Sequence, residues 1–202
     1  MDLGDPLADI IPGPRGRILA TLVQLSTPVT TRALARHAGV SPQTTLTAVN
    51  ELVDAGVLHT ERAGTANLIE LNRDHLLARP LVALGQTRNR LVEMLKDELA
   101  GWADLAGAWL FGSSARGDGG RHSDVDVLLV AKTNIETDAW AEATAHLGEH
   151  VILWTGNQAQ LVEHTRNSFR RLVRDGNSLI TAVRTEGVPL TPDSRALLRR
   201  SA

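Results

Sequence analysis

The chain has 202 residues, of which 43% are hydrophobic, so it can bury a core in one or two domains. It contains no cysteine, which excludes a disulfide framework and a thiolate metal site. The start Met-Asp-Leu-Gly-Asp does not resemble a signal peptide, and no apolar run is long enough to span a bilayer. These observations make a soluble cytoplasmic protein with no membrane partner the expectation, and the net charge of −2 says little about other partners.

Three short helices are predicted near the N-terminus. Apolar residues recur at helical spacing over 15–25, and a second helix is expected over 30–39. Ser41-Pro42 then supplies an N-cap followed by proline at the first helical position, which starts a third helix that ends at Gly56. The apolar residues that predict the buried face of this third helix are Leu46, Val49, Leu52 and Val53. The order indicates a helix-turn-helix.

A β-hairpin is predicted directly after these helices. Val57–Glu61 and Leu68–Leu71 have strand composition, and the segment between them turns at Gly64. Residues of about 14–72 together resemble the winged helix-turn-helix of bacterial transcription regulators. We therefore assign 1–72 to an N-terminal winged helix-turn-helix domain.

This resemblance implies binding to DNA. The third helix would enter the major groove with Gln43, Thr44 and Thr47, and the wing would offer Arg62 to a phosphate. However, residues 1–72 contain seven acidic and only five basic side chains, so a monomer should bind duplex weakly and a homodimer would bind better. The alternative is a winged helix that serves protein contact or dimerisation.

A connecting helix is expected over 73–100. Pro80 interrupts this segment, and leucines recur at helical spacing from Leu81 to Leu99. This apolar seam would pack on the following sheet or pair with a second protomer, and packing within the chain is the favoured interpretation.

Two apolar runs flank a glycine-rich turn in the middle of the chain. Trp109–Phe111 and Val125–Val130 predict two strands. Gly112 leaves room for a ligand, and backbone N–H groups with the hydroxyls of Ser113 and Ser114 can surround an anion. The turn therefore suits a phosphate.

Two carboxylates open the second of these strands. Asp124 and Asp126 are two residues apart, so strand alternation places both on one face, where they repel unless a cation lies between them. Two hard oxygen donors suit Mg²⁺. A phosphate cradle beside a divalent-metal pair is typical of phosphoryl or nucleotidyl transfer.

These residues resemble the minimal nucleotidyltransferases of the DNA polymerase β superfamily. Gly112-Ser113 is followed, after a spacer of ten residues, by Asp124-Val125-Asp126, and Ala115-Arg116-Gly117 and Ser123 stand in the usual places. The resemblance implies an α/β (α+β) nucleotidyltransferase core over 101–202, with a small mixed sheet flanked by helices.

The same resemblance implies the site and its ligands. Asp124 and Asp126 would be catalytic and would hold Mg²⁺, with an NTP as substrate or ligand. The residues implied to bind the nucleotide are Gly112, Ser113, Ser114 and Arg116. Such proteins are also similar to antitoxins that modify a partner toxin, so a protein partner is a further option.

The family pattern fails on the third predicted strand. A long helix is expected over 137–154, then a strand over 159–162, then a basic helix containing Arg166–Arg174. Family members carry a third carboxylate on this strand, where Gln160 stands, and an amide is a poor Mg²⁺ ligand and no base. Glu163 would lie on the opposite face, and Glu149 could substitute only if the long helix were a strand.

Two classes of function therefore stay open. The first is an enzyme that transfers a nucleoside monophosphate from an NTP to a hydroxyl acceptor. The second is a DNA-binding regulator, catalytically weak or inactive, whose nucleotidyltransferase domain senses a nucleotide or binds a protein partner. Gln160 favours the second, whereas the intact Gly112-Ser113 and Asp124-Val125-Asp126 motifs favour retained nucleotide binding.

Overall fold

The computed structural model describes residues 1–64 and 66–199. These residues form two compact units, one of residues 5–87 and one that joins residues 1–4 to residues 88–199. Within the described residues, no helix combines the length and the apolar composition needed to cross a membrane.

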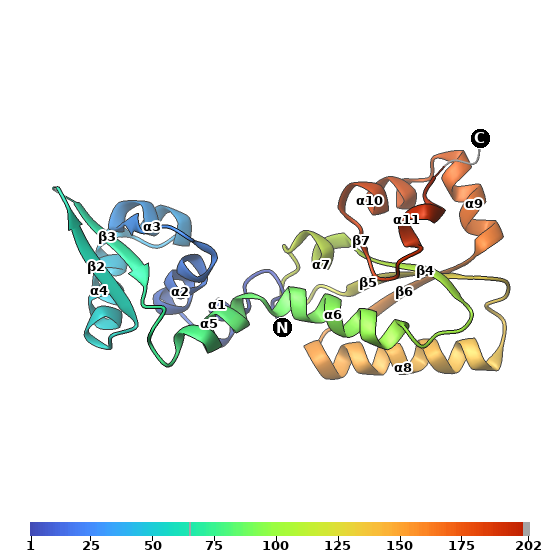
Figure 1. Cartoon of the computed structure of the whole chain (residues 1–202), viewed down its shortest axis with the longest axis horizontal. Helices are drawn as coiled ribbons and strands as arrows, with labels where there is room; N and C mark the ends of the chain where they lie inside the picture. Colours follow the sequence, from blue (N-terminus) through green and yellow to red (C-terminus); the bar gives the residue numbers. More distant parts are fainter. Residues whose placement is uncertain (65, 200–202) are drawn as a thin grey trace. The chain divides into compact units, whose positions relative to one another are not determined.

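The first unit is a winged helix-turn-helix domain (Figure 1). Its elements in chain order are α1 (Pro6–Ile10), α2 (Pro14–Gln24), β1 (Val29–Thr30), α3 (Thr31–Ala38), α4 (Pro42–Asp54), β2 (Leu58–Ala63), β3 (Ala66–Leu71) and α5 (Ala78–Gly85). The three predicted helices correspond to α2, α3 and α4, which pack around one apolar core. The predicted helix-turn-helix is confirmed.

Local capping explains where the two helices of the motif end and begin. Gly39 ends α3 in the left-handed conformation at φ +62°, which glycine adopts without steric cost. Ser41 then caps α4, because its hydroxyl accepts a hydrogen bond from the Thr44 N–H at 3.2 Å. Pro42 is the first residue of α4, as expected.

The wing is longer than predicted. Strand β2 extends to Ala63, so Arg62 lies within the strand opposite Asn67 and not in the turn. Gly64 lies in the turn with a φ of +61°. Position 65, which was also predicted in the turn, lies outside the described residues. An unpredicted two-residue strand, β1, pairs with β3, so the sheet has the order β1-β3-β2.

The buried face of α4 differs from the prediction at one position. Leu46 is 43% exposed, whereas Thr45, Ala48 and Val49 are buried. Residues 45, 48, 49 and 52 form a continuous helical face, and Leu46 lies about 100° around the helix from Thr45. The prediction chose Leu46 because it is hydrophobic, whereas burial depends on which face of the helix a residue lies on, so Thr45 is buried in its place.

The segment predicted as one connecting helix consists of two helices. Helix α5 ends before Gln86, and α6 (Thr87–Leu99) begins one residue later. Pro80 does not interrupt a helix, because it lies in the first turn of α5, where its missing N–H has no intrahelical partner. The compact units divide between Thr87 and Arg88, so the boundaries predicted at 72 and 100 do not coincide with this division.

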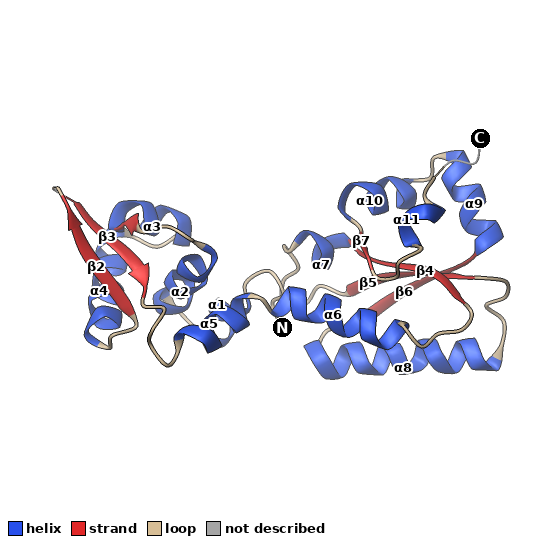
Figure 2. Ribbon diagram, in the orientation of Figure 1, coloured by secondary structure: helices blue, strands red, loops and turns tan. Residues whose placement is uncertain are grey.

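The second unit contains a four-stranded mixed sheet in the order β6-β5-β4-β7 (Figure 2). After α6, its elements are β4 (Leu105–Phe111), α7 (Gly112–Arg116), β5 (Val125–Ala131), α8 (Asp138–Thr155), β6 (Ala159–Thr165), α9 (Arg166–Asp175), α10 (Ser178–Glu186), β7 (Val188–Pro189) and α11 (Ser194–Leu197). β5 and β6 are parallel and the other pairs are antiparallel. The predicted mixed sheet flanked by helices is confirmed, whereas β7 and α11 were not predicted.

Helices cover both faces of this sheet. Helices α6 and α8 pack against one face, which carries Val127 and Leu129 of β5. Helices α9 and α10 pack against the other face, which carries Leu128 and Val130. Because both faces of β5 are covered, its apolar run is continuous, and the carboxylates of Asp126 near its start and of Asp124 directly before it stand out.

Candidate functional site

The candidate site lies where β4 ends and β5 begins. β4 is followed directly by α7, a single helical turn that starts at Gly112 instead of the open turn expected from the sequence. A short loop then leads to Asp124, and β5 starts at the next residue. Since β4 and β5 are antiparallel neighbours, Phe111 lies opposite Asp126, so Gly112 and the acidic pair are close together.

Gly112 is required here for two reasons. Its φ of +67° is unfavourable for other residues. In addition, a Cβ at this position would come within 2.2 Å of the Asp126 carboxylate oxygen Oδ2. The absence of a side chain therefore lets the Gly112 backbone lie close to the Asp126 carboxylate.

The two serines of the motif have different surroundings. Ser114 is fully buried, and its hydroxyl donates a hydrogen bond to the Asp124 carbonyl at 3.2 Å. This hydrogen bond holds α7 to the start of β5, and the predicted contact of Ser114 with a phosphate stays a prediction. Ser113 is half-buried and stays a candidate phosphate contact.

Arg116 lies at the end of α7 with an exposed side chain between two carboxylates. Its Nη1 donates to Glu186 Oε2 at 2.8 Å, and its Nε donates to Asp118 Oδ2 at 3.1 Å. These hydrogen bonds, the one to Glu186 first, raise the pKa of Arg116 above its ordinary value. The guanidinium is therefore charged at the edge of the Gly112 loop.

Asp124 is exposed and Asp126 is half-buried. Burial, followed by the charge of Asp124, raises the pKa of the Asp126 carboxyl, and Glu186 contributes in the same direction. The charge of Arg116 lowers this pKa. A carboxylate whose charge is disfavoured by burial and by a second carboxylate fits a divalent cation, which would relieve both effects.

Gln160 occupies the predicted position on β6. It lies directly opposite Asp126 in the parallel pair of β5 and β6, on the strand where the family places a third carboxylate. Glu163 lies on the opposite face, as predicted, and its Oε2 accepts a hydrogen bond from Trp140 Nε1. Glu149 lies within the long helix α8, so it does not replace the missing carboxylate. Among the residues that the structure describes, no group of three or more acidic or histidine side chains is arranged to hold a metal.

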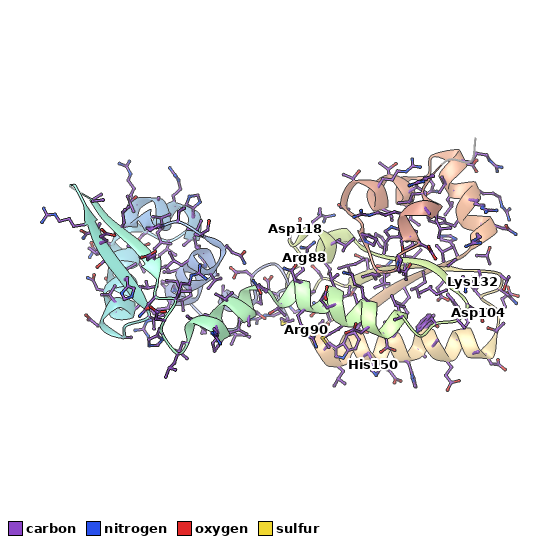
Figure 3. The ribbon with its side chains drawn as sticks, in the orientation of Figure 1. Arg88, Arg90, Asp104, Asp118, Lys132 and His150 are labelled. Atoms are coloured by element: carbon purple, nitrogen blue, oxygen red, sulfur yellow. The ribbon has the colours of Figure 1, made fainter. Side chains whose placement is uncertain are left out.

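Two residues at the site were missed from the sequence. Arg88, labelled in Figure 3, extends from α6 and donates hydrogen bonds to the Ser114 and Ala115 carbonyls, so it fixes α7. Glu186, at the end of α10, contacts both Arg116 and the Gly112 N–H. Both are far from the motif in the sequence, and neither stands in a pattern that would have identified it.

The predicted DNA-contacting residues lie together in the winged-helix unit. Gln43, Thr44 and Thr47 are exposed on α4 and line one hollow of about 460 Å³. An ion pair between Arg15 and Glu51, with 2.5 Å between Nη2 and Oε2, lies in the same hollow. Arg62 is exposed on the wing, and its Nε donates to the Gly64 carbonyl at 3.3 Å.

Comparison with solved structures gives distant likenesses, two of which are as follows. A toxin–antitoxin structure with AMP-PNP is 23% identical, with 55% of this chain and 80% of that chain covered and a TM-score of 0.36. A MarR-family transcriptional regulator from Silicibacter pomeroyi DSS-3 is 24% identical, with 42% and 62% covered and a TM-score of 0.34. Both TM-scores are below 0.5, so these likenesses carry no argument about function.

A search of curated proteins gives no significant match. The family comparison is more specific, because residues 88–176 match the model of the nucleotidyltransferase domain. This segment starts at the division between the two compact units and contains the Gly112 loop, the acidic pair and Gln160. The chain therefore contains a domain of the nucleotidyltransferase family over residues 88–176, preceded by a winged helix-turn-helix domain.

Proposed function

We propose that the chain binds an NTP with Mg²⁺ at the Gly112 loop and couples this site to a DNA-binding winged helix. The observation that carries the proposal is the close approach of Asp126 to Gly112, where a Cβ would lie 2.2 Å from the carboxylate. Asp124 and Asp126 would hold the metal, which neutralises the triphosphate charge when bound. Ser113, the Gly112 N–H and Arg116 would contact the phosphates.

Transfer by this site should be weak. In nucleotidyl transfer the acceptor hydroxyl oxygen forms a bond to the α-phosphorus, the bond to the β-phosphate bridge breaks, and pyrophosphate leaves. The hydroxyl proton then needs a base, and Gln160 cannot accept it at neutral pH. With no carboxylate opposite Asp126 on β6, the proton would pass to water, so positioning and charge neutralisation would supply the catalysis.

The second candidate function is a nucleotide-sensing regulator without transferase activity. Gln160 beside Asp126 favours this alternative. An amide at the position of the third carboxylate removes the base, whereas the groups that would bind the nucleotide stay in place. In either case the exposed polar face of α4 would read DNA, and the exposed Arg62 would contact a phosphate. A protein partner or substrate is compatible with both functions.

Calorimetric titration with ATP, GTP, CTP and UTP, with and without Mg²⁺, tests the proposal. We expect Mg²⁺-dependent binding of at least one nucleotide, and Asp124→Ala should remove the metal dependence. The exposed Asp97→Ala on α6 is the matched control and should bind as the parent does. No heat with any nucleotide would refute both functions.

A further inference from the structure

The carboxylate of Glu186 occupies the groups that a phosphate would need. Its Oε1 accepts a hydrogen bond from the Gly112 N–H at 3.2 Å. Its Oε2 accepts one from Arg116 Nη1 at 2.8 Å. The Glu186 side chain is only 17% exposed, whereas that of Arg116 is 45% exposed. The carboxylate thus lies inward of the guanidinium, against the backbone of the loop.

The fold holds Glu186 at this place. β7 follows α10 after one residue, and its Val188 pairs with Leu110 of β4, two residues before Gly112. Ile180 and Val183 of α10 are buried in the core against the sheet. The Gly187 N–H bonds to the Val183 carbonyl at 3.0 Å, which closes the end of α10. Glu186 is therefore held beside the loop by both the preceding helix and the following strand.

This placement adds negative charge to an already acidic site. Glu186 lies near enough to Asp126 to influence its carboxyl, and Asp118 contacts the same guanidinium. A carboxylate that bridges a backbone N–H and an arginine imitates the contacts of a phosphate oxygen pair. An NTP and the Glu186 carboxylate would therefore require the same two donors.

We propose that Glu186 is a built-in competitor for the nucleotide phosphates. In the nucleotide-free protein the carboxylate closes the Gly112 loop, and binding of a triphosphate requires it to release the Gly112 N–H and Arg116. This inference rests on the proposed nucleotide function. The apparent affinity is then the intrinsic affinity multiplied by the fraction of molecules in which Glu186 has released the loop.

Replacement of Glu186 tests the competition in the full chain. Glu186→Gln keeps the shape and removes the charge, and Mg²⁺-ATP should bind about tenfold more tightly if the closed form makes up about nine-tenths of the free protein. Glu186→Ala removes both hydrogen bonds and should shift the affinity in the same direction. The control is Glu142→Gln, which removes an equal charge from the exposed face of α8 and should leave the affinity unchanged.

Calorimetry with Mg²⁺-ATP measures these affinities, and thermal melts show that each variant is folded. Tighter binding of Mg²⁺-ATP by both Glu186 variants, with the affinity of Glu142→Gln unchanged, supports the inference that Glu186 competes with the nucleotide phosphates. If the parent chain binds nucleotide and the Glu186 variants bind equally or more weakly, Glu186 positions Arg116 and the inference is wrong while the proposed function stands. If neither the parent chain nor the variants bind, both the inference and the proposed function are refuted.

Discussion

Gln160 lies directly opposite Asp126 in the parallel pair of strands β5 and β6. An amide thus stands on the same face as the half-buried carboxylate, at the position where a base or third metal ligand is expected. If the site transfers a nucleotide as proposed, this relationship should limit its rate, because a missing base typically costs a factor of about 10²–10⁴ in rate.

Gln160→Asp should therefore increase nucleotidylation measured with labelled NTP, by up to about 10²-fold. The matched control is Gln160→Asn, which has the same size as aspartate and no charge, and it should give no increase. An unchanged rate in Gln160→Asp would favour the sensor without transferase activity. Robust transfer by the parent chain would contradict the role assigned to Gln160.

Asp126→Asn should raise the melting temperature of the metal-free protein at neutral pH by a few degrees. Burial and Asp124 raise the pKa of this carboxyl in the folded state, so the folded protein disfavours its charge. At pH values between the ordinary pKa and the raised one, the unfolded chain binds fewer protons at this carboxyl than the folded protein does. The free energy of unfolding therefore falls as the pH rises through this range.

Thermal melts of Asp126→Asn and of the parent chain between about pH 4 and pH 8 test the direction of this pH dependence. The difference between the two proteins should narrow towards acid pH, and Mg²⁺ should stabilise only the parent chain at neutral pH. The control is Asp97→Asn on the exposed face of α6, which should melt as the parent does. A constant difference at all pH values would contradict the explanation from burial.

The winged helix should shift duplex DNA at about 50 mM salt, where phosphate contacts are strongest. Arg62→Ala should weaken binding about equally for unrelated sequences, because a phosphate contact carries no sequence information. Gln43→Ala should change the sequence preference, because Gln43 is exposed on α4. Gel shifts with two unrelated fragments distinguish these effects, and an unshifted fragment at low salt would favour the protein-contact interpretation.

Thr45→Val should stabilise the winged-helix unit by about 1 kcal/mol. The Thr45 hydroxyl is fully buried and has no hydrogen-bond partner among the described residues. Valine has nearly the same shape and removes the unsatisfied polar group. Urea unfolding measures the change, and Thr47→Val on the exposed face of α4 is the control, with little change expected. A lower free energy of unfolding in Thr45→Val than in the parent chain would indicate that the Thr45 hydroxyl does have a hydrogen-bond partner.

The sequence by itself determined the features that depend on neighbouring residues. Ser41-Pro42 predicted the start of α4, and the structure shows the hydroxyl of Ser41 capping that helix. The spacing from Gly112 to Asp126 predicted the loop and the acidic strand, because both lie within one hairpin-like segment. Strand alternation also placed Glu163 on the face opposite the site.

Only the tertiary structure decided which distant groups complete the site. Ser114 and Ser113 are adjacent in sequence, yet packing directs the Ser114 hydroxyl inward to the Asp124 carbonyl. Glu186 contacts Gly112 although 74 positions separate them, because the pairing of β7 with β4 brings the end of α10 to the loop. Local patterns specify helices, strands and their faces, whereas such contacts depend on strand order and register, which are fixed only when the whole sheet packs.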